Sequence, residues 1–308
     1  MDYIDLHADT LTEITSGDLT KNTADIDLSR IRKQFTHYTQ IFAIWKDQAQ
    51  VEKSRREEVF MQTYQRARAL LADAGEEILL CQSFAEMEAA WKSGQYAAFL
   101  SIEDLSFMGN YAAQAAELGF RFAMLTWNYE NEYGCGAAKS NKTHLTPLGK
   151  QMIRELTAQG IILDLSHLSD GGVEDVLELT DRAVIASHSD VRKICGQPRN
   201  LTDTHIRELI RRKGLIGMNL YRDFVGADRQ VDLRMLFSHM DAVLALGGED
   251  VLAFGCDFDG CDGHFPEQIT GVESMSFLQR EMEAAGFDQK LQQKIFSGNA
   301  YAFLKRNL

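Results

Sequence analysis

The segment from Gly160 to Ser189 constrains the fold of this chain more than any other stretch. It reads GIILDLSHLSDGGVEDVLELTDRAVIASHS, in which two short apolar runs each lead into a histidine, His167 and His188. Continuous apolar runs of this kind are typical of strands buried on both faces. Between them, Ser169 or Asp170 can cap a helix whose apolar residues recur at helical spacing. The segment therefore predicts a β-α-β unit with a histidine after each strand.

Similar apolar runs recur along the whole chain, and amphipathic segments lie between most of them. The expected strands are Tyr3–Leu6, Thr39–Ile44, Ala97–Ile102, Phe120–Leu125, Gly160–Leu165, Ala183–Ser187, Gly214–Asn219 and Val251–Cys256. The expected helices include Lys53–Ala74, Thr146–Gln159, one from Thr202 or Asp203 to Arg212, Asp232–Leu246, Val272–Ala285 and one near Asp288–Lys305. This alternation predicts an α/β fold, a (β/α)8 TIM barrel, with residues 1–308 as one catalytic domain. A doubly wound open sheet is the alternative, but no glycine-rich phosphate loop follows the first strand.

Composition excludes several classes of function. The net charge of −13 disfavours nucleic acid as a partner, because phosphate binding needs a basic face. No apolar run approaches the roughly 20 residues of a membrane helix, and the first residues lack the features of a signal peptide. The five scattered cysteines fit a reducing compartment better than a disulfide framework, so we expect a cytoplasmic protein.

Polar side chains follow most of the expected strands. These strand ends are His7-Ala8-Asp9, Glu103-Asp104, Thr126-Trp127-Asn128, Ser166-His167, His188-Ser189 and Asp257-Phe258-Asp259-Gly260. Charged or imidazole groups would be costly if they only filled a barrel interior. The carboxyl ends of all barrel strands meet at one mouth of the barrel. The presence of polar residues at the ends of several strands therefore indicates the active site of an enzyme.

Two imidazoles with one or two carboxylates suit zinc, and the strand ends contain enough of both for two ions. The candidate ligands are His7, Asp9, Glu103, His167 and His188. A pair of divalent ions can activate water at neutral pH and polarise a carbonyl oxygen. Any one of these histidines, taken alone, is more often a buried, hydrogen-bonded structural residue than a metal ligand. The five residues taken together favour a metal site.

In order and spacing, these motifs resemble the membrane (renal) dipeptidases, peptidase family M19, over nearly the whole chain. The motifs are D-L-H-A-D-T at 5–10, the Glu103 segment, D-L-S-H at 164–167, S-H-S at 187–189 with Arg199-Asn200 downstream, and G-C-D-F-D-G at 255–260. The resemblance implies a barrel of the metal-dependent hydrolase type and a zinc-dependent dipeptidase. The absence of a secretion signal suggests a bacterial, cytosolic type of member.

The resemblance also implies a role for each matching position. His7 and Asp9 would hold one zinc ion, His167 and His188 the other, and Glu103 would bridge the two. Asp257 would be the general base and acid, which takes a proton from water and returns it to the departing amine. Arg199 would bind the terminal carboxylate of the substrate, with help from Tyr221. The expected cofactors are two Zn²⁺ ions per chain, although His/carboxylate sites also accept Mn²⁺ or Co²⁺.

One motif departs from the family. Better-known members carry Leu-Thr-His after the fourth strand, and that histidine binds the oxyanion, whereas this chain has Leu125-Thr126-Trp127. Losing one oxyanion donor can cost ~10²–10³ in rate. Trp127 or Asn128 are our candidates for this contact with the substrate, and Asn131 and His144 lie in the same loop.

The departure leaves the substrate class open. Dipeptides, with L-D dipeptides among them, are the leading choice. The alternatives are a related amidohydrolase that acts on N-acyl amino acids, cyclic amides or lactones, and a catalytically silent metal-binding protein. A homodimer is the default expectation for the assembly.

Overall fold

The computed structural model describes residues 1–227 and 230–308, and in this part of the chain nine strands form a single parallel sheet. The strands are β1 (Asp2–Ala8), β2 (His37–Ile44), β3 (Ile78–Leu80), β4 (Tyr96–Ile102), β5 (Phe120–Met124), β6 (Ile162–Asp164), β7 (Ile185–Ala186), β8 (Leu215–Met218) and β9 (Leu252–Phe254). Eight of them pair in chain order, and β9 returns to pair with β1. The sheet therefore closes into a (β/α)8 TIM barrel, which confirms the predicted fold class.

Each predicted barrel strand is present, and the structure adds one strand that the prediction missed. The additional strand, β3, pairs with the first residues of β4, while β5 pairs with the last residues of the same strand. It has only three residues, Ile78–Leu80, which is too short a run for a periodic signal.

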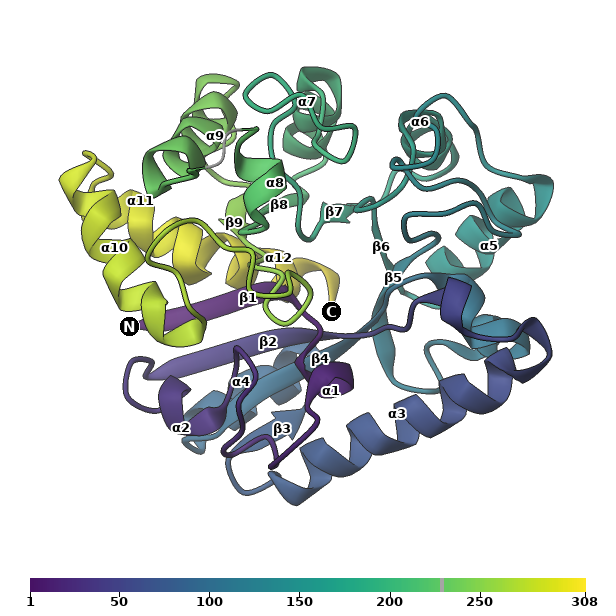
Figure 1. Cartoon of the computed structure of the whole chain (residues 1–308), viewed down its shortest axis with the longest axis horizontal. Coiled ribbons are helices and arrows are strands. Elements are labelled where there is room, and N and C mark those ends of the chain that lie inside the picture. Colours follow the sequence, from purple (N-terminus) through teal and green to yellow (C-terminus); the bar gives the residue numbers. More distant parts are fainter. Residues whose placement is uncertain (228–229) are drawn as a thin grey trace.

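Helices surround the strands, with α5 and α10 on opposite sides (Figure 1). The α-helices are α1 (Thr10–Glu13), α2 (Leu28–Ile31), α3 (Arg56–Asp73), α4 (Phe84–Lys92), α5 (Pro147–Ala158), α6 (Asp170–Leu179), α7 (Asp203–Arg211), α8 (Arg222–Val225), α9 (Leu233–Ala245), α10 (Met275–Ala284), α11 (Gln289–Gln293) and α12 (Asn299–Asn307). Short 3₁₀ segments are Gln48–Gln50, Lys53–Arg55 and Val272–Ser274; Leu105–Gln114 is also 3₁₀ but is interrupted by a kink at Gly109, and a π-helical turn spans Lys294–Gly298.

Local sequence sets several helix starts. The side chains of Thr146, Ser169 and Thr202 each accept a hydrogen bond from a backbone N–H in the first turn of α5, α6 and α7. Such caps satisfy donors that have no partner inside the helix. The helix predicted near Asp288–Lys305 is confirmed, and a π-helical turn at Lys294–Gly298 lies within it, between α11 and α12.

The barrel strands are apolar on both faces because each face packs against a different layer. In β4, Ala97 and Phe99 belong to a cluster that includes residues of α4 and α12, whereas Ala98 and Leu100 belong to the larger cluster under the other helices. Burial on both faces explains the continuous apolar runs of the sequence. Within the described ranges, no helix combines the length and the apolar character that a bilayer span requires.

Candidate metal centre

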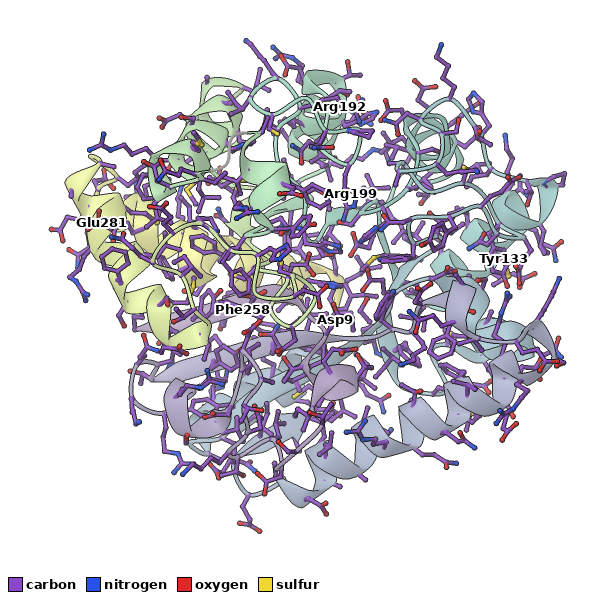
Figure 2. All side chains as sticks on the ribbon, in the orientation of Figure 1. Asp9, Tyr133, Arg192, Arg199, Phe258 and Glu281 are labelled. Atoms are coloured by element: carbon purple, nitrogen blue, oxygen red, sulfur yellow. The ribbon has the colours of Figure 1, made fainter. Side chains whose placement is uncertain are left out.

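Five strands deliver their terminal polar residues to one end of the barrel. β1 leads to His7 and Asp9, β4 to Glu103, β6 to His167, β7 to His188, and β9 to Asp257. Asp9 and Arg199 lie near the middle of the molecule, whereas Glu281 is at its margin (Figure 2). The structure therefore brings together the residues that the sequence analysis singled out as metal ligands and proton shuttle.

Glu103 lies between two imidazoles. Its Oε2 is 3.2 Å from Nε2 of His7, and its Oε1 is 3.0 Å from Nε2 of His167. The His167 and His188 Nε2 atoms are 2.8 Å apart, and Asp9 Oδ2 is 3.6 Å from Nε2 of His7. The residues form three groups of three potential ligands, in each of which the ligand atoms lie within 4.8 Å of one another: His7-Asp9-Glu103, Glu103-His167-His188 and His7-His188-Asp257. Glu103 is common to the first two groups.

Several buried polar atoms of this cluster have no hydrogen-bond partner in the described part of the chain. They are both ring nitrogens of His7, Oδ1 of Asp9 and Oε2 of Glu103. A buried polar group without a partner is costly, so an arrangement of this kind needs a ligand to complete it. Imidazole nitrogens and carboxylate oxygens are the donors that zinc and similar divalent cations prefer. The residues present therefore fit a pair of divalent metal ions.

Hydrogen bonds to other residues orient the two histidines from β6 and β7. Nδ1 of His167 lies 2.9 Å from Oδ1 of Asn128, and Nδ1 of His188 lies 2.7 Å from the hydroxyl of Ser187. An amide oxygen only accepts hydrogen bonds, so Nδ1 of His167 carries the proton and Nε2 remains free for a metal. Asn128 thus orients a proposed ligand, a role that the sequence analysis did not foresee.

Burial keeps the imidazoles of His167 and His188 neutral, whereas the carboxylates near His7 favour its charged form. Burial, assisted by repulsion from Arg199, lowers the pKa of His167 to about 3, and burial lowers the pKa of His188 well below its usual value. Burial also opposes charge on His7, but attraction to Glu103 outweighs it and raises the pKa of His7 well above the usual value. A neutral imidazole is the form that binds metal.

Two buried aspartates on the strands align these strand ends. Oδ1 of Asp5 accepts hydrogen bonds from the backbone N–H of His7 at 3.0 Å and of Cys256 at 3.2 Å. Oδ1 of Asp164 accepts one from the N–H of Ser187 at 3.0 Å. Each carboxylate therefore links its own strand to a neighbour just before the cluster. This is the physical role of the first residue in the D-L-H and D-L-S-H motifs.

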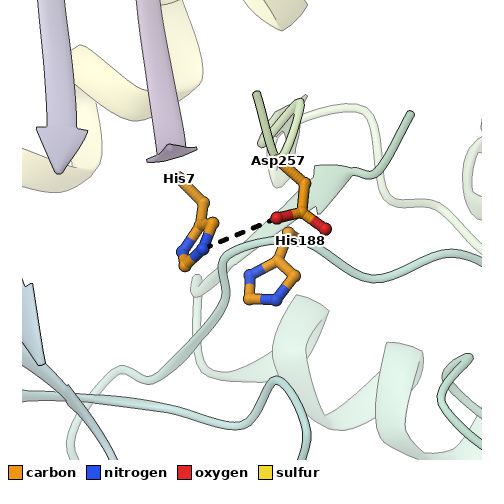
Figure 3. Close-up of side chains that lie close together, drawn as sticks. All are labelled: His7, His188 and Asp257. Atoms are coloured by element: carbon orange, nitrogen blue, oxygen red, sulfur yellow. Dashed lines mark ion pairs between the residues drawn. The ribbon is translucent and has the colours of Figure 1, made fainter. Parts of the chain in front are cut away.

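Asp257 reaches the cluster from β9. Its Oδ1 is 3.7 Å from Nε2 of His7, and Figure 3 shows its carboxylate beside the rings of His7 and His188. β1 ends at Ala8, and Asp9 is the N-cap residue of α1.

The backbone is strained where three strands end. Asp104, His167 and Asp257 have φ angles of 66°, 67° and 61°, in the left-handed region. Non-glycine residues adopt this region rarely, and such residues concentrate at functional sites.

A pocket of about 210 Å³ opens over the cluster. It is lined by Asp9, Trp45, Glu103, Trp127, Asn128, His167, Tyr221, Phe224, Asp257, Gly260 and Asp262. Trp127, Asn128 and Tyr221, predicted to contact the substrate, are therefore all at its wall. The other two loop candidates are not in the wall. Asn131 donates from Nδ2 to Oδ1 of Asp104 and to the carbonyl of Leu125, both at 2.8 Å, and His144 is exposed beside Asp175.

Arg199 is buried, with 5% of its surface exposed, so it is not a solvated surface arginine. Its Nη1 donates to the hydroxyl of Ser189 at 2.9 Å and its Nη2 to the carbonyl of His188 at 3.0 Å. No carboxylate pairs with it among the residues that the structure describes. Arg199 does not line the pocket itself. Its guanidinium lies 5.6 Å from the ring of Phe224, which is a residue of the pocket wall.

Several residues at the site had no predicted role, among them Trp45, Asn219 and Gly260. Trp45 follows β2, and its ring is 5.0 Å from that of Trp127. Asn219 follows β8 and donates from Nδ2 to Oδ2 of Asp257 at 3.1 Å. Gly260 packs against Asp9 and Asp257. Their position directly after a strand or in the D-F-D-G motif is the signal that could have identified them.

Comparisons with known proteins bear on this site. The family model described as "Membrane dipeptidase (Peptidase family M19)" matches residues 1–306. An uncharacterized protein in the pqqA 5′ region of Klebsiella pneumoniae is 28% identical over 252 residues, which cover 77% of this chain and 91% of that protein. Dipeptidase 3 of Mus musculus is 28% identical over 189 residues, which cover 59% of this chain but only 38% of the mouse protein.

Among solved structures, a metallopeptidase from Rhodobacter sphaeroides liganded with a phosphinate mimic of the dipeptide L-Ala-D-Ala is similar throughout. The TM-score is 0.87 at 23% identity, and the match covers 100% of this chain and 99% of that one. At this identity the likeness establishes the fold.

Proposed function

The chain belongs to the membrane dipeptidase family, peptidase family M19, and is a hydrolase that acts on dipeptides; we propose that it uses two zinc ions for this reaction. His7 and Asp9 would hold one ion, His167 and His188 the other, and Glu103 both. The observation that carries this proposal is that the two oxygens of Glu103 face different imidazoles, at 3.2 and 3.0 Å. We also propose that residues 1–308 act as one catalytic domain.

When bound, a pair of divalent ions supplies activation of water and polarisation of the scissile carbonyl. The protein supplies proton transfer through Asp257, whose Oδ1 lies 3.7 Å from Nε2 of His7. Burial raises the pKa of Asp257, which brings the carboxyl group closer to the range in which it can both accept and return a proton. The departing amine is the proposed acceptor of that proton.

Arg199 would bind the free carboxylate of the substrate and so restrict the enzyme to short peptides. Burial lowers its pKa to about 10, so the guanidinium remains a cation at neutral pH. A buried cation without a carboxylate partner in the described chain is a ready partner for an anionic group. Tyr221, at the pocket wall, would assist in this contact.

The wall formed by Trp45, Trp127 and Asn128 would face the rest of the dipeptide. The Rhodobacter relative was crystallised with a mimic of L-Ala-D-Ala, and we propose that this chain likewise accepts a D-residue at the carboxyl end. Trp127 in place of the family's histidine is the observation that favours the second candidate, an amidohydrolase acting on N-acyl amino acids, cyclic amides or lactones.

Metal analysis and a substrate panel test the proposal. We expect close to two zinc ions per chain after loading, loss of activity on chelation, and recovery with Zn²⁺, Mn²⁺ or Co²⁺. The panel compares L-L and L-D dipeptides with N-acyl amino acids. Turnover of N-acyl amino acids alone would contradict the dipeptidase, and full activity in metal-free protein would contradict the metal centre.

A further inference from the structure

Asn219 makes a direct hydrogen bond to the proposed proton shuttle. It is fully buried just after β8, and its Nδ2 donates to Oδ2 of Asp257 at 3.1 Å. The other carboxylate oxygen, Oδ1, faces Nε2 of His7 at 3.7 Å. The amide of Asn219 therefore determines which oxygen of Asp257 points towards the metal cluster.

The orientation of this amide is itself defined. Oδ1 of Asn219 accepts a hydrogen bond from the backbone N–H of Tyr221 at 2.6 Å. Because that N–H can only donate, the amide oxygen must face it, and the NH₂ group must face Asp257. The backbone N–H of Asn219 donates to Oδ1 of the buried Asp190 at 3.2 Å, which holds the strand end in place.

The same amide connects Asp257 to Arg199. The carbonyl oxygen of His188 accepts hydrogen bonds from Nδ2 of Asn219, at 3.4 Å, and from Nη2 of Arg199, at 3.0 Å. The proton shuttle and the guanidinium are thus both positioned relative to one backbone oxygen of a proposed metal ligand.

Two close backbone approaches bring these strand ends together. Gly217 and Gly255 lie two residues before Asn219 and Asp257, and a Cβ at either glycine would be 1.8 or 1.6 Å from the carbonyl oxygen of Ser187. Only glycine permits such an approach. The repeated pattern G-x-N and G-x-D therefore places both side chains beside the strand end that carries His188.

We propose that Asn219 is a positioning residue that holds the Asp257 carboxylate in a fixed relation to the cluster and to Arg199. This inference rests on the proposed function, in which Asp257 transfers the proton. The amide acts on catalysis through Asp257, and no role in metal binding is assigned to it.

The test uses two Asn219 variants and a control. Asn219→Asp retains the volume and the acceptor for Tyr221 but replaces the donor with a carboxyl oxygen, which either repels Asp257 or shares a proton with it, so kcat of this variant is followed as a function of pH. Asn219→Leu removes both the donor and the acceptor. The control is Asn299→Leu, because Asn299 is also a buried asparagine, whose Nδ2 donates to the carbonyls of Glu249 and Leu252 at 2.8 Å, away from the cluster. Each zinc-loaded protein is assayed for kcat, KM, zinc content and melting temperature with a dipeptide that the wild type hydrolyses.

We expect both Asn219 variants to lose about 10- to 100-fold in kcat, the usual effect of removing a hydrogen bond to a charged group. KM and zinc content should stay within about twofold of wild type, and Asn299→Leu should lose stability without losing kcat. If Asn219→Leu does not fold, the isosteric Asn219→Asp decides.

Two results would overturn the inference alone. One is a wild-type kcat at every pH in Asn219→Asp. The other is a fall in kcat that is accompanied, in both variants, by a rise in KM and a loss of bound zinc. This result would mean that Asn219 only supports the strand end. A wild type that hydrolyses no dipeptide in the zinc-loaded form overturns the proposed function and this inference together.

Discussion

Gly260 offers the sharpest test of the site because a single methyl group there would meet both functional carboxylates. A Cβ built on Gly260 lies 2.2 Å from Oδ1 of Asp257 and 2.4 Å from Oδ2 of Asp9. Real Cβ contacts are essentially never below 3.0 Å, so the two oxygens fall short of that limit by 0.8 and 0.6 Å. Gly260→Ala must therefore displace at least one carboxylate by more than half an ångström from its present position.

The expected effect is on activity rather than on folding. Both atoms that would move are the ends of side chains, and the backbone of Gly260 is not in the left-handed region, so the cost to stability is small. A misplacement of about 1 Å at a catalytic group can cost on the order of 10²-fold in rate. We expect Gly260→Ala to lose about that factor in kcat/KM and to bind zinc more weakly, since Asp9 is a proposed ligand.

The assay compares Gly260→Ala with Gly196→Ala in zinc titration, steady-state kinetics and thermal unfolding. Gly196 is the matched control, because a Cβ there meets nothing within 4 Å and its φ is not positive. A Gly260→Ala protein with wild-type kinetics and zinc affinity would refute the argument that Asp9 and Asp257 must keep their present positions.

Three further predictions concern substrate, metal and pH. Arg199→Met should raise KM at least about tenfold without lowering the melting temperature, because it removes a buried charge that has no carboxylate partner in the described chain; an unchanged KM would contradict the carboxylate role. Asn128→Ala should weaken zinc binding about 10- to 100-fold, measured by competition with a chelator, because His167 loses its orienting acceptor; unaltered affinity would count against that role. Burial, with repulsion from Asp259, raises the pKa of Asp25 to about 6, so the ionised form weakens the fold. Below pH ~4 the Asp25 carboxyl is protonated in the folded and the unfolded chain and does not reduce the free energy of unfolding. As the pH rises through about 6 the carboxyl ionises in the folded protein, and the free energy of unfolding falls. Asp25→Asn should therefore stabilise the protein by about 1 kcal/mol at pH 7.5, after allowance for partial exposure, and by nothing at pH 4. Equal effects at both pH values in denaturant titrations would contradict the assignment.

The amino-acid sequence by itself determined the class of fold and which residues gather at the candidate metal centre. Strands buried on both faces must be continuously apolar, so each barrel strand is visible as a short run, and for most strands a polar residue stands out after the run. Since parallel strands in a barrel share one carboxyl end, the gathering of His7, Glu103 and His188 follows from topology. Helix caps are also local, and Ser169, one of the two predicted candidates, is the N-cap of α6.

Only the tertiary structure decided how these residues are held. Asn128 was expected to contact the substrate, whereas in the structure its Oδ1 accepts a hydrogen bond from His167. Asn219 had no predicted role, and in the structure its amide donates a hydrogen bond to Asp257. Both contacts join residues whose separation in the chain has no periodicity, and they depend on the register of neighbouring strands. The close packing of Gly260 against the carboxylates of Asp9 and Asp257 likewise arises only when the two loops that carry these residues pack together. Residue type and spacing can predict which groups reach a common site, but the hydrogen bonds that orient them arise only when the barrel closes.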